Sequence, residues 1–174
     1  MEWRLRPTSM VKAVWLAPEN SRLMETEQAL QKLCDICSRQ EKCPADVLSL
    51  LSRWGVDKEK HQEVLEKLKV EKFIDEHRYA TAFTRDKMKF DHWGITKIRF
   101  LLQHKGISRE VAEEVLNETD MDEYRAMIEK EISKKRKTLR GSPREVWAKL
   151  MRYGMSRGYE TEYLRPILGD SSGD

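Results

Sequence analysis

The chain has 174 residues, and its 36% charged and 39% hydrophobic residues are typical of a helix-rich, water-soluble protein. Eight glycines and five prolines are too few for a β-sandwich or a long disordered linker. No apolar run approaches the roughly 20 residues that cross a membrane, and the first 21 residues lack the apolar core of a secretory signal. We therefore expect a cytoplasmic protein with no membrane contact.

Residues 1–20 match no later segment and form an N-terminal extension without an assigned structure. Three cysteines, Cys34, Cys37 and Cys43, follow within ten residues. An odd number without a secretory signal argues against a disulfide framework. Cys34 and Cys37 have the spacing of a metal or redox pair but share an apolar helical face with Leu30, which favours buried thiols. A zinc site completed by His61 is the alternative, and it lacks a second CxxC pair. We expect no metal and no cofactor.

Three glycines punctuate the rest of the chain: Gly55, Gly106 and Gly154. Each follows a segment with helical spacing of apolar residues, and a glycine there commonly ends the helix in a left-handed conformation because it has no Cβ. A helix break precedes each glycine by about a dozen residues, at Cys43-Pro44, Trp93-Gly94 and Ser142-Pro143. The order of long helix, short helix and helix therefore occurs three times, as in repeat architectures.

Apolar residues recur with a period near 3.6 in each repeat, which indicates one buried stripe per helix. Ser142 to Glu145 has the pattern of a capping box with proline at the first helical position. The sequence predicts an all-α fold of three tandem three-helix modules in an elongated, curved array. The modules cover residues 21–70, 71–119 and 120–168, and a disordered tail covers 169–174. Each module buries few apolar side chains, so packing between modules should add to stability.

Positive charge is gathered in two stretches although the net charge is only +3. Residues 84–109 carry seven lysines and arginines against Asp86 and Asp91, and residues 133–158 carry nine against Glu145. Residues 110–123, between the two stretches, are acidic. Such segregation predicts one basic and one acidic surface.

The basic stretches supply the candidate contacts to a partner or to nucleic acid. On a helix over residues 74–90, Arg78, Arg85 and Lys89 would lie within about 40° of one another. Stacked modules would join them to the second basic stretch in a surface that suits a polyanion or an acidic protein groove. The candidate residues are Arg78, Arg85, Lys89, Lys97, Arg99, Lys105, Lys134, Lys135, Arg136, Lys137, Arg140, Arg144, Arg152 and Arg157.

Other roles stay open for several of these residues. Arg78 and Arg85 would brace the module if they paired with Asp75 or Asp86, and a lysine run such as 134–137 often forms a solvated helix face. Four aromatic residues are candidates for stacking on bases, although core packing is favoured for the first two: Tyr79, Phe83, Trp93 and Phe100.

One segment resembles a known family. The residues Phe73-Ile74-Asp75-Glu76, Arg78-Tyr79-Ala80, Phe83, Arg85-Asp86, Gly94, Ile98, Leu101 and Lys105-Gly106-Ile107 are similar to the central signature of the RecX proteins, bacterial modulators of the RecA recombinase. The resemblance implies a monomer of three helical modules that binds the RecA filament on single-stranded DNA. It further implies inhibition of the ATPase, strand exchange and co-protease activities, hence regulation of recombinational repair and the SOS response, with weak non-specific DNA binding at most.

Two other classes of function remain. An enzyme is disfavoured because the sequence has no P-loop, nucleophile elbow, HExxH motif or glycine-rich dinucleotide turn. A helix-turn-helix-like, sequence-specific DNA-binding regulator is the main alternative. The helices after Gly55 and Gly106 would have to read the DNA, and they carry many carboxylates, which phosphates repel. A helical scaffold whose basic face binds nothing is the third possibility.

Overall fold

The structure is a computed structural model that describes residues 24–169. The predictions for residues 1–20 and for the tail from residue 170 onward lie outside this range. Within it the chain forms nine helices and no strand. The helices are α1 (Thr26–Arg39), α2 (Pro44–Arg53), α3 (Lys58–Val70), α4 (Glu76–Lys89), α5 (Ile95–His104), α6 (Arg109–Asn117), α7 (Met121–Arg136), α8 (Pro143–Arg157) and α9 (Thr161–Leu168).

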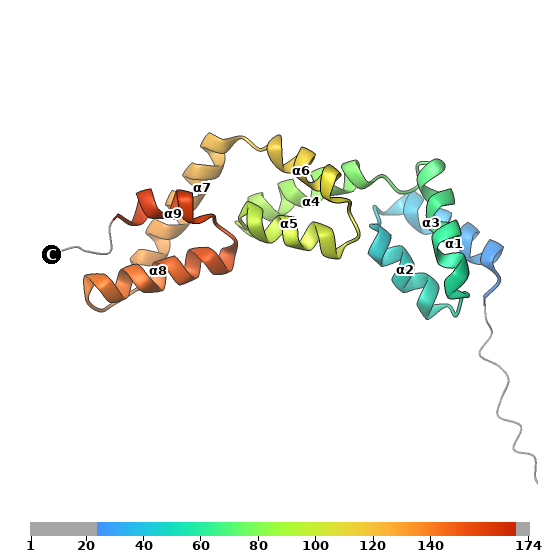
Figure 1. The fold of residues 1–174 in the computed structure, drawn as a ribbon, viewed down its shortest axis with the longest axis horizontal. Helices are drawn as coiled ribbons and strands as arrows, with labels where there is room; N and C mark the ends of the chain where they lie inside the picture. The colour runs from blue at the N-terminus through green and yellow to red at the C-terminus, as the bar shows by residue number, and fades with distance from the viewer. Residues whose placement is uncertain (1–23, 170–174) are drawn as a thin grey trace, which may run out of the picture.

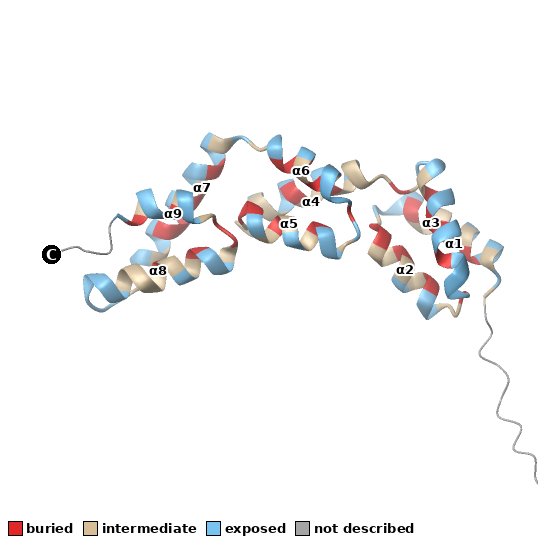
Figure 2. Ribbon diagram, in the orientation of Figure 1, coloured by how far each residue is buried: buried red, intermediate tan, exposed pale blue. Residues whose placement is uncertain are grey.

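The helices form three groups of three along an elongated, curved molecule (Figure 1), which confirms the predicted fold class. We call α1–α3, α4–α6 and α7–α9 the first, second and third modules. Their predicted boundaries, at 70/71 and 119/120, stay predictions. Buried residues line the inside of each group, while the outer helix faces are exposed (Figure 2).

The buried residues divide into two clusters. The first module has a core of its own, with Leu33, Leu51 and Leu68 fully buried. The second and third modules share one continuous core, in which Ile98 and Leu164 are fully buried. Burial of a large aliphatic side chain stabilises a fold by roughly 1.5–3 kcal/mol. Shared burial therefore couples the last two modules more strongly than the first two.

Local sequence explains where the helices begin. Pro44 and Pro143 open α2 and α8, where a missing N–H costs no hydrogen bond. The predicted capping box of α8 is present, since Ser142 and Glu145 each accept a hydrogen bond from the other's backbone N–H. Four more helices have a side-chain N-cap: Asp57 on α3, Asp75 on α4, Ser108 on α6 and Asp120 on α7.

Two of the three predicted glycine caps are confirmed, and the third is wrong. Gly55 and Gly106 follow α2 and α5 with φ of +73° and +78°. Gly154 instead lies inside α8, and the helix continues to Gly158, whose φ is +88°. Gly154 is needed for packing, because a Cβ there would collide with the side chain of Leu164 on α9.

The joint between the second and third modules is made by backbone and buried side chains. The N–H of Gly94 donates to the carbonyl of Arg157 at 2.8 Å, and that of Thr96 donates to the carbonyl of Gly158 at 3.2 Å. The buried hydroxyl of Tyr124 accepts from the N–H of Ile95 at 3.0 Å. These contacts fix α5 against the end of α8.

The joint between the first and second modules combines ion pairs with a small apolar contact, in which the buried Cys43 packs into the core of the second module. Lys69 on α3 pairs with Glu76 on α4 at 2.8 Å. Arg78 pairs with Glu41 through two N–H groups, with nitrogen–oxygen distances of 2.5 and 3.2 Å. One backbone hydrogen bond, from Ala45 to the carbonyl of Lys105 at 3.0 Å, also crosses the joint. The Arg78 pair is a bidentate contact between side chains that are about half exposed, so salt should weaken it.

The cysteine cluster is part of the protein interior. Cys37 and Cys43 are buried and Cys34 is half-buried, and all three are free thiols. Burial raises the pKa of each thiol, which keeps it protonated and poorly reactive. His61, the candidate fourth ligand, has its Nε2 3.0 Å from the carbonyl oxygen of Val56. In residues 24–169 no group of three or more His, Cys, Asp or Glu residues is placed to hold a metal ion.

Over the same range, no helix combines the length and apolarity that crossing a membrane would require.

Candidate partner-binding surfaces

The structure divides the candidate cations among different roles. Arg78 joins the first two modules through Glu41, and lies 4.0 Å from Asp75, one of the two bracing partners expected. Arg99 pairs with Glu113 on α6, with nitrogen–oxygen distances of 2.6 and 3.2 Å, and this arginine lowers the pKa of Glu113. Both arginines therefore brace the fold.

A row of alternating aromatic and lysine side chains crosses the second module, and we call it the ladder. It consists of Tyr79, Phe83 and Lys87 on α4, Trp93 in the following loop, and Lys97 and Lys105 on or just after α5. Tyr79 and Phe83 stack with ring centroids 6.0 Å apart. These two rings are half-buried against the core, as expected, while Trp93 is also half-buried.

The lysines of the ladder lie over the aromatic rings. The ammonium of Lys105 is 5.7 Å from the centroid of Tyr79 and 5.5 Å from that of Phe83. Lys87 is 5.7 Å from Phe83 and 4.7 Å from Trp93, and Lys97 is 4.2 Å from Trp93 on the next step. Each such contact contributes roughly 0.5–2 kcal/mol and holds the ammonium in place without neutralising it.

The ladder continues across the joint into the third module. The backbone of Lys97 packs directly against Gly158. Next to that glycine, Arg157 donates to the carbonyl of Asp91 at 2.8 Å, and its guanidinium lies 5.4 Å from the centroid of Tyr153. Lys135 on α7 is also 5.4 Å from this ring. The ladder therefore connects cations from both predicted basic stretches.

Positive charge along aromatic rings suits an anionic polymer. Lysine ammoniums offer mobile point charges to phosphate or carboxylate, and partly open rings offer platforms on which bases stack. Lys87 alone in the ladder has a close acidic partner, Asp91 at 2.7 Å. The other three ladder lysines and Arg157 form none of the salt bridges found in residues 24–169.

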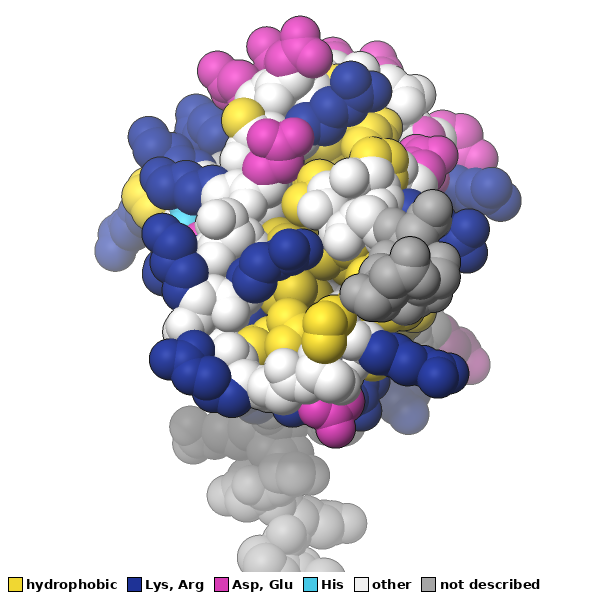
Figure 3. All heavy atoms as spheres, turned by 90° about the vertical axis from the view of Figure 1, so that its left-hand side faces the viewer, with side chains coloured by type: hydrophobic (Ala, Val, Ile, Leu, Met, Phe, Trp, Pro, Cys, Tyr) yellow, Lys and Arg dark blue, Asp and Glu magenta, His cyan; other side chains and the backbone are white. Residues whose placement is uncertain are grey.

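The remaining cations of the second basic stretch lie at the far end of the molecule. Seen from that end, lysine and arginine side chains surround an apolar strip (Figure 3). The side chain of Lys134 is 77% exposed and lies 3.9 Å from Glu131. Arg140 donates to the carbonyls of Lys137 and Leu139, and Lys149 donates to that of Arg140. These carbonyls follow the C-terminal end of α7, where the helix dipole favours positive charge. The other exposed members are Arg136, Lys137, Arg144 and Arg152.

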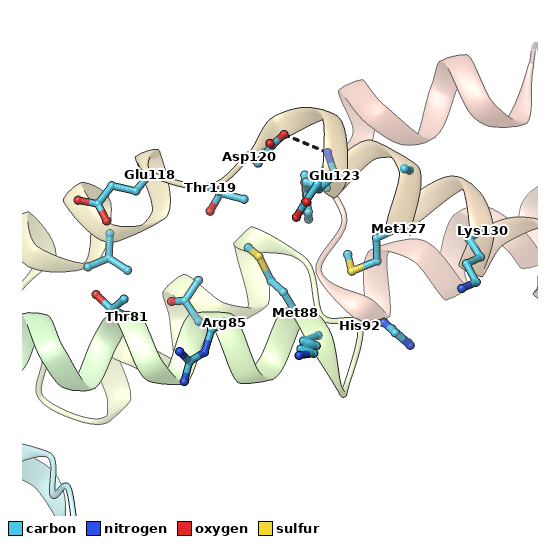
Figure 4. Close-up of a pocket in the computed structure, with 15 residues that line it drawn as sticks. Thr81, Arg85, Met88, His92, Glu118, Thr119, Asp120, Glu123, Met127 and Lys130 are labelled. Atoms are coloured by element: carbon cyan, nitrogen blue, oxygen red, sulfur yellow. Dashed lines mark hydrogen bonds between the residues drawn. The ribbon is translucent and has the colours of Figure 1, made fainter.

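Arg85 and Lys89 face a different surface from the ladder. They line a groove between α4 and α7 with a volume of about 800 Å³ (Figure 4). Within residues 24–169, the one ion-pair partner of Arg85 is its neighbour Asp86, at 3.5 Å. The predicted stripe of Arg78, Arg85 and Lys89 is thus divided between a module joint and a groove.

Sequence reasoning missed several residues of these surfaces. Lys87, Tyr153 and Lys130 were not among the candidates, although Lys87 stands four residues after Phe83 on the same helical face. Phe100 is 57% exposed and lies over His104 with centroids 4.4 Å apart, away from the ladder contacts.

Comparison with known proteins identifies the relatives of this fold. Residues 75–116 match the family described as "RecX, second three-helix domain", and residues 122–164 match "RecX, third three-helix domain". A "Regulatory protein RecX" from Clostridium tetani is 32% identical over 122 residues, which are 68% of this chain and 55% of the relative. A "Regulatory protein RecX" from Prosthecochloris aestuarii is 27% identical over 146 residues, which are 84% of this chain and 95% of the relative.

The chain spans 63% of the length of a third relative, a "Regulatory protein RecX" of Clostridium botulinum that is 29% identical over 137 residues. Among solved structures, "Crystal structure of regulatory protein RecX" superposes with a TM-score of 0.75 at 22% identity, covering 82% of this chain and 72% of the other. "Crystal structure of RecX from Lactobacillus salivarius" superposes with a TM-score of 0.70 at 19% identity, covering 82% of this chain and 94% of the other. These two likenesses establish the fold. With both domain matches and relatives along most of its length, the chain belongs to the RecX family.

Proposed function

We propose that the protein is a cytoplasmic regulator that binds the RecA filament on single-stranded DNA. In this proposal it inhibits the filament's ATPase, strand exchange and co-protease activities by binding, without catalysis of its own, and so regulates recombinational repair and the SOS response. The observation that carries the proposal is the ladder, which runs across the joint between the second and third modules. Membership of a family of regulatory proteins supports it.

The physical argument starts from the surface that a filament presents. A nucleoprotein filament repeats protein and DNA phosphate along a helical track, and an elongated array can follow such a track over neighbouring subunits. The ladder lysines would pair with phosphates or acidic loops, while the aromatic rings between them would stack on exposed bases. Binding across subunits opposes the motions that accompany ATP turnover, so inhibition follows from bridging.

We assign the candidate cations accordingly. Lys97, Lys105, Lys135 and Arg157 contact the filament through the ladder, and the exposed cations of the third module extend this contact. Arg78 and Arg99 stabilise the fold and do not contact the filament, because carboxylates already hold their guanidinium groups. The module boundaries at 70/71 and 119/120 remain part of the proposal.

The test is ATP hydrolysis by purified RecA on single-stranded DNA, titrated with this protein. A triple variant, Lys97→Ala, Lys105→Ala and Lys135→Ala, removes three ladder charges, and circular dichroism checks that it folds. The matched control removes three charges from the first module with Arg39→Ala, Arg53→Ala and Lys58→Ala, all at exposed positions. We expect inhibition by the wild type and by the control, and inhibition about tenfold weaker by the triple variant.

Binding to filaments at several salt concentrations gives a second readout. Each phosphate contact that is lost reduces the slope of log affinity against log salt by about one. Equal inhibition by the wild type and the folded triple variant would show that the ladder is not the contact. If the wild type neither inhibits nor co-sediments with filaments, the proposed function is wrong.

A further inference from the structure

The groove between α4 and α7 lies on the opposite side of α4 from the ladder. At 100° per residue, the groove residues Thr84, Arg85 and Met88 point roughly 125° away from the ladder residues Phe83 and Lys87 on average. The volume of about 800 Å³ lies within the range of ligand-binding clefts. Two separate surfaces therefore share one helix.

The floor of the groove is apolar and adaptable. Met88 on α4 and Met127 on α7 both project into the space between these helices (Figure 4), and Val115 on α6 also lines it. Both methionines are half-buried. Methionine side chains are unbranched and polarizable, and proteins use them where a surface must fit the apolar side chains of a partner.

The two edges of the groove carry opposite charges. Arg85 and Lys130 project along one edge and Glu118 and Glu123 along the other (Figure 4). Among the salt bridges of residues 24–169, none joins one edge to the other. Glu118 lies 4.0 Å from His77 only. The groove thus offers a basic edge, an apolar floor and an acidic edge to a single occupant.

Unpaired polar atoms indicate the kind of occupant. Thr84 lines the groove and is 5% exposed, yet its hydroxyl has no hydrogen-bond partner among the described residues. The Nδ1 of His92, another lining residue, is buried and also lacks one. A buried polar atom without a partner costs roughly 1–3 kcal/mol. Both side chains line the groove, so rotation about their side-chain bonds would bring these atoms within reach of an occupant with free backbone N–H and C=O groups. A helix uses these groups internally.

The backbone at His92 supports a functional role. His92 has a φ of +51°, which is uncommon for a residue with a Cβ, and its carbonyl accepts from the hydroxyl of Tyr159 at 2.7 Å. Strained residues that neighbours hold in place cluster at binding sites. Tyr159 belongs to the loop before α9, so the third module fixes this end of the groove.

We propose that the α4–α7 groove binds an extended segment of a protein partner. The segment places an apolar side chain on Met88 and Met127, a carboxylate toward Arg85 and Lys89, and a cation toward Glu118 and Glu123. This inference rests on the proposed function, in which the segment belongs to a filament subunit. The ladder then contacts the DNA side of the filament, and the groove contacts its protein.

Two experiments test the groove with filaments of purified RecA on single-stranded DNA. The first replaces Thr81, an exposed residue of the groove, with the photo-crosslinking residue p-benzoylphenylalanine, and identifies the cross-linked peptide by mass spectrometry. The same replacement at Gln62, exposed on α3, is the control. We expect Thr81, and not Gln62, to cross-link to a RecA segment that is extended and carries an acidic and a basic residue around an apolar one.

The second experiment reverses the charges of two basic residues that line the groove, with Arg85→Glu and Lys89→Glu, both at exposed positions. The matched control, Arg53→Glu with Lys58→Glu, changes the net charge equally, away from the groove. We expect co-sedimentation with filaments to weaken about tenfold more in the groove variant than in the control. Binding of both variants to free single-stranded DNA should be equal, since the ladder is intact.

The outcomes separate the two proposals. If the wild type binds filaments, and the groove variant binds them as well as its control does, the groove proposal is wrong while the proposed function stands. Cross-linking of Thr81 to DNA or to a second copy of this chain would also overturn it. If the wild type does not bind filaments at all, both proposals fail.

Discussion

Gly94 and Gly158 meet where the second and third modules join, and neither site has room for a Cβ. At Gly94 an added Cβ would fall on the carbonyl of Gly158, and at Gly158 it would fall on Lys97. We predict that Gly94→Ala lowers the free energy of unfolding by about 1–3 kcal/mol through overpacking. Thermal and urea denaturation measure it. Thr96→Ala, at an exposed neighbouring position, is the control and should change stability by less than about 0.5 kcal/mol.

Glu113 gives a prediction on pH. Its hydrogen bonds from Arg99 lower its pKa below the ordinary value in the unfolded chain. The stabilisation is therefore present above the unfolded pKa, near 4.3, and is lost as pH falls through the lower folded pKa. We predict that Glu113→Gln is less stable than the wild type in urea at pH 7, and that the difference shrinks by pH 3. An equal difference at both pH values would contradict this account.

Single residues also mark the limit of sequence reasoning. The signature around Arg78 was recognised, and Asp75 was an expected partner, yet the close partner is Glu41, which is 37 residues away. Likewise Gly154 was interpreted as a helix end, because its role depends on Leu164 of another helix. Local spacing predicts which face a residue occupies, but it does not predict which side chain a neighbouring module places there.

At the scale of helices, α8 is the one that begins with a complete capping box among those of residues 24–169. Ser142 and Glu145 satisfy each other's backbone N–H groups, and Pro143 fixes the first turn. We predict that Ser142→Ala destabilises the protein by about 1 kcal/mol in urea denaturation. Ser133→Ala, an exposed change inside α7, is the control and should have an effect below about 0.5 kcal/mol. Equal effects of the two substitutions would show that the cap does not determine stability.

Helices were predictable because their signals are local. Apolar spacing, proline and capping residues act within one or two turns, so the repeat of three helices could be derived from the sequence. The ladder could be derived only in part. Tyr79, Phe83 and Lys87 are four residues apart along α4, but Trp93, Lys97 and Tyr153 come from other elements. The α4–α7 groove had no sequence signal, since its lining residues come from α4, α6 and α7 and meet only in the folded chain.

Over the whole molecule, the two joints differ in what holds them. The second and third modules share buried core residues and two backbone hydrogen bonds from α5. At neither joint does a pair of helices make extensive contact within residues 24–169, so the difference lies in the shared core. Between the first and second modules, Cys43 is the buried first-module residue that packs into the other core. The first module should therefore move as a separate body more easily than the third.

High salt should make it easier for the first module to move independently of the other two. The Debye length falls from about 10 Å at 0.1 M salt to about 3 Å at 1 M, which weakens the half-exposed pair of Arg78 and Glu41. We predict that, in 1 M salt, NMR relaxation of the wild type shows faster tumbling for the backbone amides of the first module than for those of the other two modules. In the Arg78→Ala variant the same difference should be present already at 0.1 M salt. Lys67→Ala removes a pair inside α3 and should not have this effect.

The reversed pair distinguishes charge attraction from loss of packing. Arg78→Glu with Glu41→Arg keeps opposite charges across the joint, so it should restore common tumbling that Arg78→Ala has lost. If the first module tumbles with the others in Arg78→Ala even at 1 M salt, the joint is held instead by the buried Cys43, by Ala45 and by the contact of Pro44 with Gly106. If salt weakens the first joint, the first module can adjust its orientation to the curvature of a filament. The second joint stays rigid, so the two sections of the ladder on either side of it remain aligned and keep their contacts with the filament.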